Sequence, residues 1–235
     1  MYRTSILGDD FFLFSQENFF GPSCTLFGDA MTVGLLPSIT ADFSLIGYTK
    51  LGKPLSDYRA AAISAAAFLV LKRGLPLSEI LFETPGGNIE VFYTGGRIFE
   101  VSTPKCKQII TNKIEVMGCV VEYADFCTDA LFRVIRTDNI DNFDLKIIPR
   151  FASVGEKTPS SVILYSVKDS KIDMRTYSEF NPSPPSAITC FGIASYAAFF
   201  KTCASQFAFG GAICRLDYGG ARISLKPEIY EEEFT

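Results

Sequence analysis

The sequence contains no histidine, and this absence excludes several kinds of active site. None of the 235 residues is His, so Ser-His-Asp and Cys-His catalytic groups are excluded, as are zinc sites with His ligands. Any proton transfer in this chain must use Asp, Glu, Cys, Tyr or Lys side chains.

Runs of like charge and long apolar runs are also lacking. The chain has 22 Lys and Arg against 26 Asp and Glu, a net charge of -4, and a nucleic-acid surface would need a basic stripe. No segment approaches the roughly 18 apolar residues of a membrane span, and the apolar stretch near Met1 is too short for a signal peptide. We therefore expect a cytoplasmic protein with neither nucleic acid nor a membrane as its partner.

The seven cysteines form no recognisable framework. Their number is odd, they are scattered along the chain, and no C-x-x-C pair occurs. This pattern predicts neither a disulfide framework nor a structural zinc site. Most of the cysteines are expected to be small buried residues in a reducing compartment.

What the sequence does contain is a set of short strands and two apolar helices. Runs of β-branched and aromatic residues bounded by Gly, Pro, Asn or Asp predict strands at 11–14, 90–93, 97–101, 161–165 and 221–225. Gly95-Gly96 between two of them indicates a hairpin. Ala-rich segments at 59–72 and 187–201 predict helices that are apolar on nearly every side, and such helices belong in a protein interior.

The two helical segments are related by a shift of 132 residues. The shift places Ala62 on Ala194 and Phe68 on Phe200. It predicts two copies of one unit, each an antiparallel sheet around a buried helix. The alternative is a chance match between two Ala-rich segments.

The order of several short motifs resembles the diaminopimelate epimerase family over nearly the whole chain. The motifs are Gly8-Asp9-Asp10-Phe11 for the family's G-N-D-F, Glu83-Thr84-Pro85-Gly86-Gly87 for E-T-x-x-G, Val116-Met117-Gly118 for V-x-M-G, and Thr189-Cys190 with Ala194 for A-C-G-T-G-A. The resemblance implies an α+β fold of two pseudo-repeated halves, each an antiparallel barrel-like sheet around a buried central helix. The halves would span 1–112 and 113–225, with 226–235 returning to the first half or trailing off.

The resemblance also implies a kind of chemistry. The family inverts an amino-acid α-carbon without a cofactor or metal, using two cysteines at the N-termini of the central helices, on either side of a cleft between the halves. In this chain the first position is Tyr58 and the second is Cys190. The implied catalytic pair is therefore Cys190 as base and Tyr58 as acid, and the implied substrate-binding residues are Asp9, Arg59, Phe191, Gly192 and Ser161.

Each of these residues also has a plain structural interpretation. Cys190 could be one more buried thiol, and Tyr58 could fill space left by a lost substrate. Arg59 could be solvated or paired with an acid. Asp9 and Asp10 could be exposed turn residues rather than a carboxylate pair that holds a cation.

The departures of the site from the family pattern share one feature, the loss of groups that would bind the substrate. Residues 181–186 lack the acid and arginine of the family's loop, and the asparagine of G-N-D-F is Asp9. Few donors remain for a dicarboxylic amino acid, so diaminopimelate is not the expected substrate. Two functions stay open: an isomerase of the same lineage acting on a small amino or carboxylic acid in the cleft, or a non-catalytic ligand-binding or interaction protein. A homodimer is a further alternative.

Overall fold

A computed structural model describes most of the chain. The described residues are 2–7, 9–21, 30–116, 118–128, 130–138, 140–152, 158–168, 171–178, 181–183, 186–200, 206–209, 212–217 and 220–231. The motif residues Gly8 and Met117, part of the 181–186 loop, residue 201 of the second predicted helix and residues 232–235 of the predicted tail lie outside them.

The chain forms two compact units, Met1–Ser102 with Ser224–Thr235, and Thr103–Ile223. The predicted boundary after residue 112 lies within a strand of the second unit. Strands of the first unit are β1 (Tyr2–Ile6), β2 (Asp9–Ser15), β3 (Met31–Leu36), β4 (Phe43–Tyr48), β5 (Glu79–Thr84), β6 (Gly87–Gly95), β7 (Ile98–Ser102) and β17 (Glu228–Glu231). Its helices are a 3-10 turn (Gln16–Asn18) and α1 (Arg59–Ala67), which continues as a π-helical turn (Phe68–Lys72).

The second unit has a similar composition of elements. Its strands are β8 (Gln108–Val116), β9 (Cys119–Cys127), β10 (Leu131–Arg136), β11 (Ser161–Lys168), β12 (Lys171–Ser178), β13 (Asn181–Ser183), β14 (Gln206–Phe209), β15 (Ala212–Asp217) and most of β16 (Gly220–Leu225). Its helices are a 3-10 turn (Leu145–Ile147), α2 (Ile148–Ala152) and α3 (Ala187–Phe200).

The same pairing pattern occurs in both units. From β1 to β6, successive neighbours pair antiparallel, parallel, antiparallel, parallel and antiparallel. Strands β9, β10, β11, β12, β14 and β15 pair in the same order of senses. The predicted α+β fold of two pseudo-repeated halves is confirmed.

The sheets are mixed, however, whereas the prediction made them antiparallel. Parallel neighbours cannot be joined by a tight turn and need a crossover connection. Helix α1 is the crossover from β4 to β5, and α3 lies in the crossover from β12 to β14. In each unit, the same crossover connection therefore supplies the central helix and joins the two parallel strands beside it.

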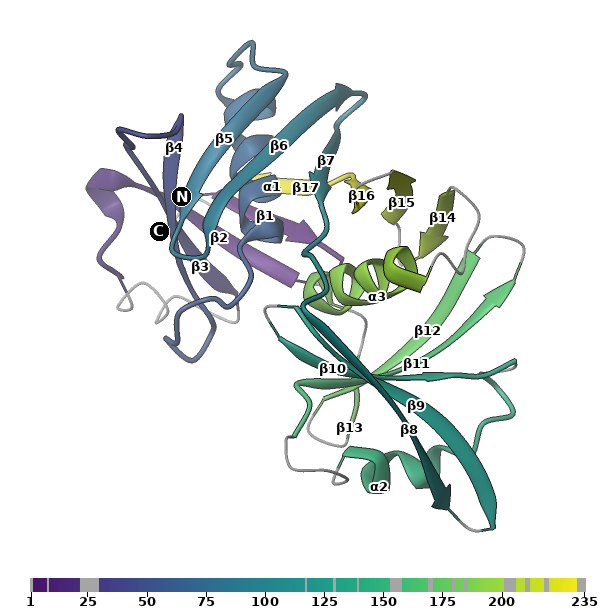
Figure 1. Cartoon of the computed structure of the whole chain (residues 1–235). Coiled ribbons are helices and arrows are strands. Elements are labelled where there is room, and N and C mark those ends of the chain that lie inside the picture. The colour runs from purple at the N-terminus through teal and green to yellow at the C-terminus, as the bar shows by residue number, and fades with distance from the viewer. Residues whose placement is uncertain are drawn as a thin grey trace. The chain divides into compact units, whose positions relative to one another are not determined.

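Both predicted helices are present and lie in the core of their units (Figure 1). Every residue of α1 from Ala60 to Ala67 is buried, and so are residues 189–195 of α3. Small side chains allow the surrounding strands to approach the helix closely on all sides. None of the helices in the described part of the chain is long and apolar enough to cross a membrane.

The sheet of the second unit is covered on both faces. Along β10, Phe132 lies against Gly192 of α3, while Ile135 belongs to a cluster that includes Ile148 and Phe151 of α2. Alternate residues of a strand point to opposite faces. Helices α3 and α2 therefore lie on opposite sides of this sheet, as Figure 1 shows.

Candidate functional site

Tyr58 directly precedes α1 and is fixed to the neighbouring strand β4. Its hydroxyl accepts a hydrogen bond from the Gly47 N–H at 3.2 Å and donates to the Gly47 carbonyl, with an oxygen–oxygen distance of 3.3 Å. The side chain is 4 % exposed, and this burial raises the pKa of Tyr58 above its ordinary value of 10.0. The hydroxyl is therefore a neutral group that binds the backbone of its own unit.

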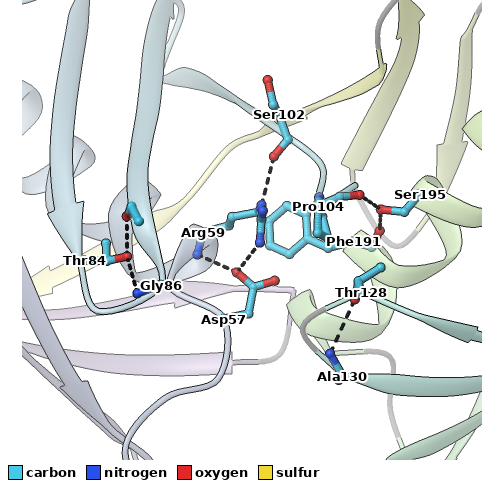
Figure 2. A network of polar contacts seen from close by, with 11 residues as sticks. Asp57, Arg59, Thr84, Gly86, Ser102, Pro104, Thr128, Ala130, Phe191 and Ser195 are labelled. Atoms are coloured by element: carbon cyan, nitrogen blue, oxygen red, sulfur yellow. Dashed lines mark hydrogen bonds and ion pairs between the residues drawn. The ribbon is translucent and has the colours of Figure 1, made fainter. Parts of the chain in front are cut away.

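Arg59 and Asp57 occupy the start of α1 (Figure 2). Asp57 Oδ1 accepts the Arg59 backbone N–H at 2.9 Å and its Nη1 at 3.0 Å. Arg59 Nε donates to the Ser102 carbonyl at 3.0 Å. The first N–H of a helix is one of the groups that can bind an anion, and here a carboxylate of the chain itself binds it.

In the second unit, α3 begins before Cys190, which is its fourth residue. Ser186 and Thr189 cap the helix reciprocally: the Ser186 N–H donates to Thr189 Oγ1 at 2.9 Å, and the Thr189 N–H to Ser186 Oγ at 3.5 Å. The Cys190 N–H donates to the Ser186 carbonyl at 3.0 Å. The Cys190 side chain is 0 % exposed, so both its thiol and its N–H lie inside the unit.

Two of the other implied binding residues of the second unit, Gly192 and Ser161, lie next to Phe132. A Cβ added to Gly192 would lie 3.0 Å from the Phe132 ring, so the glycine lets α3 approach β10. Ser161 is the first residue of β11 and pairs with Phe132. Phe191 is 1 % exposed. Gly192 thus takes part in the contact of α3 with β10, and Ser161 in the pairing of β10 with β11.

Asp9 and Asp10 are the first residues of β2, not residues of a turn as the sequence suggested. Adjacent strand residues point to opposite faces, so their carboxylates do not face one another. Asp10 pairs with Arg3 at 2.6 Å. Burial raises the pKa of Asp10, but the hydrogen bonds from Arg3 and Ser5 and the positive charges of Arg3 and Lys50 together outweigh this, so the pKa is lowered overall. Among the described residues, no three or more Cys, Asp and Glu side chains gather as a metal site.

The motif Glu83–Gly87 contains the turn between β5 and β6. The Thr84 hydroxyl donates to the Gly87 carbonyl at 2.6 Å and accepts the Gly86 N–H at 3.2 Å (Figure 2). Glu83 accepts a hydrogen bond from the Ser38 hydroxyl at 2.6 Å. The polar groups of this motif thus hold two neighbouring loops of the first unit in place.

Two buried polar residues were not singled out from the sequence. Arg133 of β10 is 1 % exposed; its Nε and Nη2 each lie 2.6 Å from a carboxylate oxygen of Asp125, and its Nη1 donates to the Phe151 carbonyl. Ser195 of α3 donates to the Pro104 carbonyl at 2.7 Å. The available signal for Arg133 was an arginine between the apolar pairs 131–132 and 134–135. The sequence offered no signal for Ser195.

The sequence matches no model of a protein family and no curated protein. Solved structures, in contrast, share the fold over almost the whole chain. A phenazine biosynthesis protein of the PhzF family from Enterococcus faecalis has a TM-score of 0.70 at 12% identity, covering 98% of this chain and 96% of that one.

Two further structures carry the name of an activity. A hydroxyproline epimerase from Agrobacterium vitis, with bound trans-4-hydroxy-L-proline, has a TM-score of 0.65 at 9% identity and covers 97% of this chain and 90% of its own. A methylitaconate-delta-isomerase has a TM-score of 0.61 at 9% identity, covering 100% and 95%. At such identities the likeness shows the fold alone, and this chain has the fold that these epimerases and isomerases share.

Proposed function

We propose that this chain descends from cofactor-independent isomerases and acts as a non-catalytic binding or interaction protein. The observation that carries the proposal is that the side chains implied for catalysis are bonded or buried within their own units. Tyr58 binds Gly47, and Cys190 has no exposed surface.

Two-base inversion of a carbon centre requires particular protonation states and positions of the two catalytic side chains, here Tyr58 and Cys190. One base must be deprotonated and the other protonated, and both must reach the same carbon. Tyr58 has a raised pKa and its proton is engaged by the Gly47 carbonyl, so neither removing nor returning a substrate proton is favoured there.

Binding of the substrate carboxylate meets a similar obstacle. An anion at a helix N-terminus needs free N–H groups. Asp57 accepts the first N–H of α1, and Ser186 with Thr189 caps α3. Part of the N-terminal donor set of each helix is therefore already used by the chain itself.

The second candidate is an isomerase that acts on a different small acid without a cofactor. It is favoured by the shared fold with an epimerase and an isomerase, and by the thiol of Cys190 at the family's second catalytic position. Under this proposal Cys190 is the base and the substrate is a small amino or carboxylic acid.

Deuterium exchange separates the two candidates. The protein is incubated in D2O with proline, trans-4-hydroxyproline, methylitaconate and diaminopimelate, and α- or allylic deuterium is measured by NMR, with Cys190→Ser as the matched variant. We expect no exchange above the protein-free rate. Exchange at ~1 s⁻¹ or faster that is lost in Cys190→Ser would establish the isomerase instead.

A further inference from the structure

The chain passes between its two units at two points, after Ser102 and after Ile223. The strand that ends at the first point is β7, and the second point lies within β16. At the second crossing, Ser224 donates to Glu100 Oε1 at 2.8 Å, and these two side chains are 5 % and 6 % exposed. The returning strand is thus anchored inside the first unit by a buried hydrogen bond.

The first crossing is a short connector, Ser102–Pro104. Pro104 has no N–H, so it cannot extend the ladder of β7. The carbonyls of Pro104 and of Ser102, the last residue of β7, accept hydrogen bonds from side chains instead. Figure 2 shows where the donors come from: Arg59 Nε reaches the Ser102 carbonyl at 3.0 Å, and Ser195 Oγ reaches the Pro104 carbonyl at 2.7 Å. Each contact lies within one unit.

Both donors are held in position by their own helices. The guanidinium of Arg59 is oriented by Asp57, and its side chain is 18% exposed. Ser195 is 3 % exposed, and its single hydroxyl hydrogen is shared between the Pro104 carbonyl at 2.7 Å and the Phe191 carbonyl of its own helix at 2.9 Å. Neither side chain has to lose much freedom when it binds the connector.

We propose that Arg59 and Ser195 are positioning residues that anchor the connector Ser102–Pro104 to the central helix of each unit. Arg59, which the family resemblance implied as a substrate-binding residue, thereby acts on the chain's own backbone. This inference goes beyond the proposed function and does not rest on it, since it concerns backbone order and not chemistry.

Limited proteolysis measures the anchoring directly, because Lys105 and Lys107 are exposed trypsin sites next to the connector. Cleavage of a folded segment requires local opening. Arg59→Lys keeps the charge but not the guanidinium fork, and Ser195→Ala removes the hydroxyl. We expect each to accelerate cleavage after Lys105 about fivefold, the factor that corresponds to one lost hydrogen bond.

Matched controls are Arg3→Lys, another paired arginine of the first unit, and Ser64→Ala, another fully buried helical serine, whose hydroxyl has no partner among the described residues. The proposal would be overturned if both test variants were cleaved at the wild-type rate. It would also be overturned if the control variants were accelerated as much as the test variants. If a test variant does not fold, tryptic cleavage of the wild-type protein decides. Cleavage after Lys105 that is slower than cleavage after Lys50, an exposed loop residue of the first unit, would support the anchors, and cleavage at the same rate or faster would contradict them.

Discussion

At the start of α1, Tyr58 stands where the family resemblance implies a cysteine, and a tyrosine has different acid–base properties. A thiol has an unperturbed pKa near 8.5, whereas a phenol has one near 10, and burial raises that of Tyr58 further. The longer side chain also reaches Gly47 on β4. The sequence could identify the position of Tyr58 and its weakness as a base. It could not identify Gly47 as the partner, because that contact depends on how β4 lies beside α1.

Replacing Tyr58 with Phe tests this interpretation through stability. The variant leaves the Gly47 N–H without this acceptor, so we expect the free energy of unfolding at pH 7 to fall by about 1–2 kcal/mol. Because the folded pKa of Tyr58 is raised, its contribution is complete below pH 10 and is lost as the pH rises further.

Urea unfolding between pH 7 and 11 measures both effects. Wild-type protein should lose stability more steeply above pH 10 than Tyr58→Phe does. Tyr93→Phe, a half-buried tyrosine of β6, controls for the loss of any phenol. Parallel pH curves for wild type and Tyr58→Phe would show that the Tyr58 hydroxyl is not held in its neutral form.

Among the elements, α2 could not be predicted from the sequence. It is five residues long, too short for a periodic pattern, and it is stabilised by packing on β10 and by the bond from Arg133 to the Phe151 carbonyl. The long apolar helices and the Gly95-Gly96 hairpin could be predicted, because local composition determines them. The parallel pairs depend on contacts between distant segments, which composition does not reveal.

The pair of Arg133 and Asp125, with two contacts of 2.6 Å and a fully buried guanidinium, should contribute strongly to the stability of the second unit. Replacing Arg133 with Met leaves a mostly buried carboxylate without its partner, and we expect a loss of about 3 kcal/mol or more. The double variant Arg133→Met with Asp125→Leu should be less destabilised than the single one, because no unpaired charge remains. Arg175→Met, which breaks an exposed pair with Asp141, should cost under about 1 kcal/mol. A double variant as unstable as Arg133→Met would contradict this account.

For the whole molecule, the fold could be predicted from the sequence, whereas the contacts of the site residues could not. The repeat and the motif order predicted two similar halves, and the pairing pattern confirms them. At the implied site, in contrast, Tyr58 binds the backbone of Gly47, Arg59 pairs with Asp57, and Cys190 is buried. Motif matching could not anticipate this, because it assigns a position without showing which way the side chain points.

The central claim is that Cys190 has become a structural residue, and thiol labelling tests it most directly. Cys106 and Cys127 are half-buried references in the same unit, whereas Cys190 is fully buried. The folded protein is treated with iodoacetamide at pH 7 and its peptides are mapped over time, with urea-unfolded protein as the control in which every thiol reacts. We predict that Cys190 is labelled more slowly than Cys106 and Cys127. Fast and selective labelling of Cys190 would show an accessible, activated thiol and contradict the account.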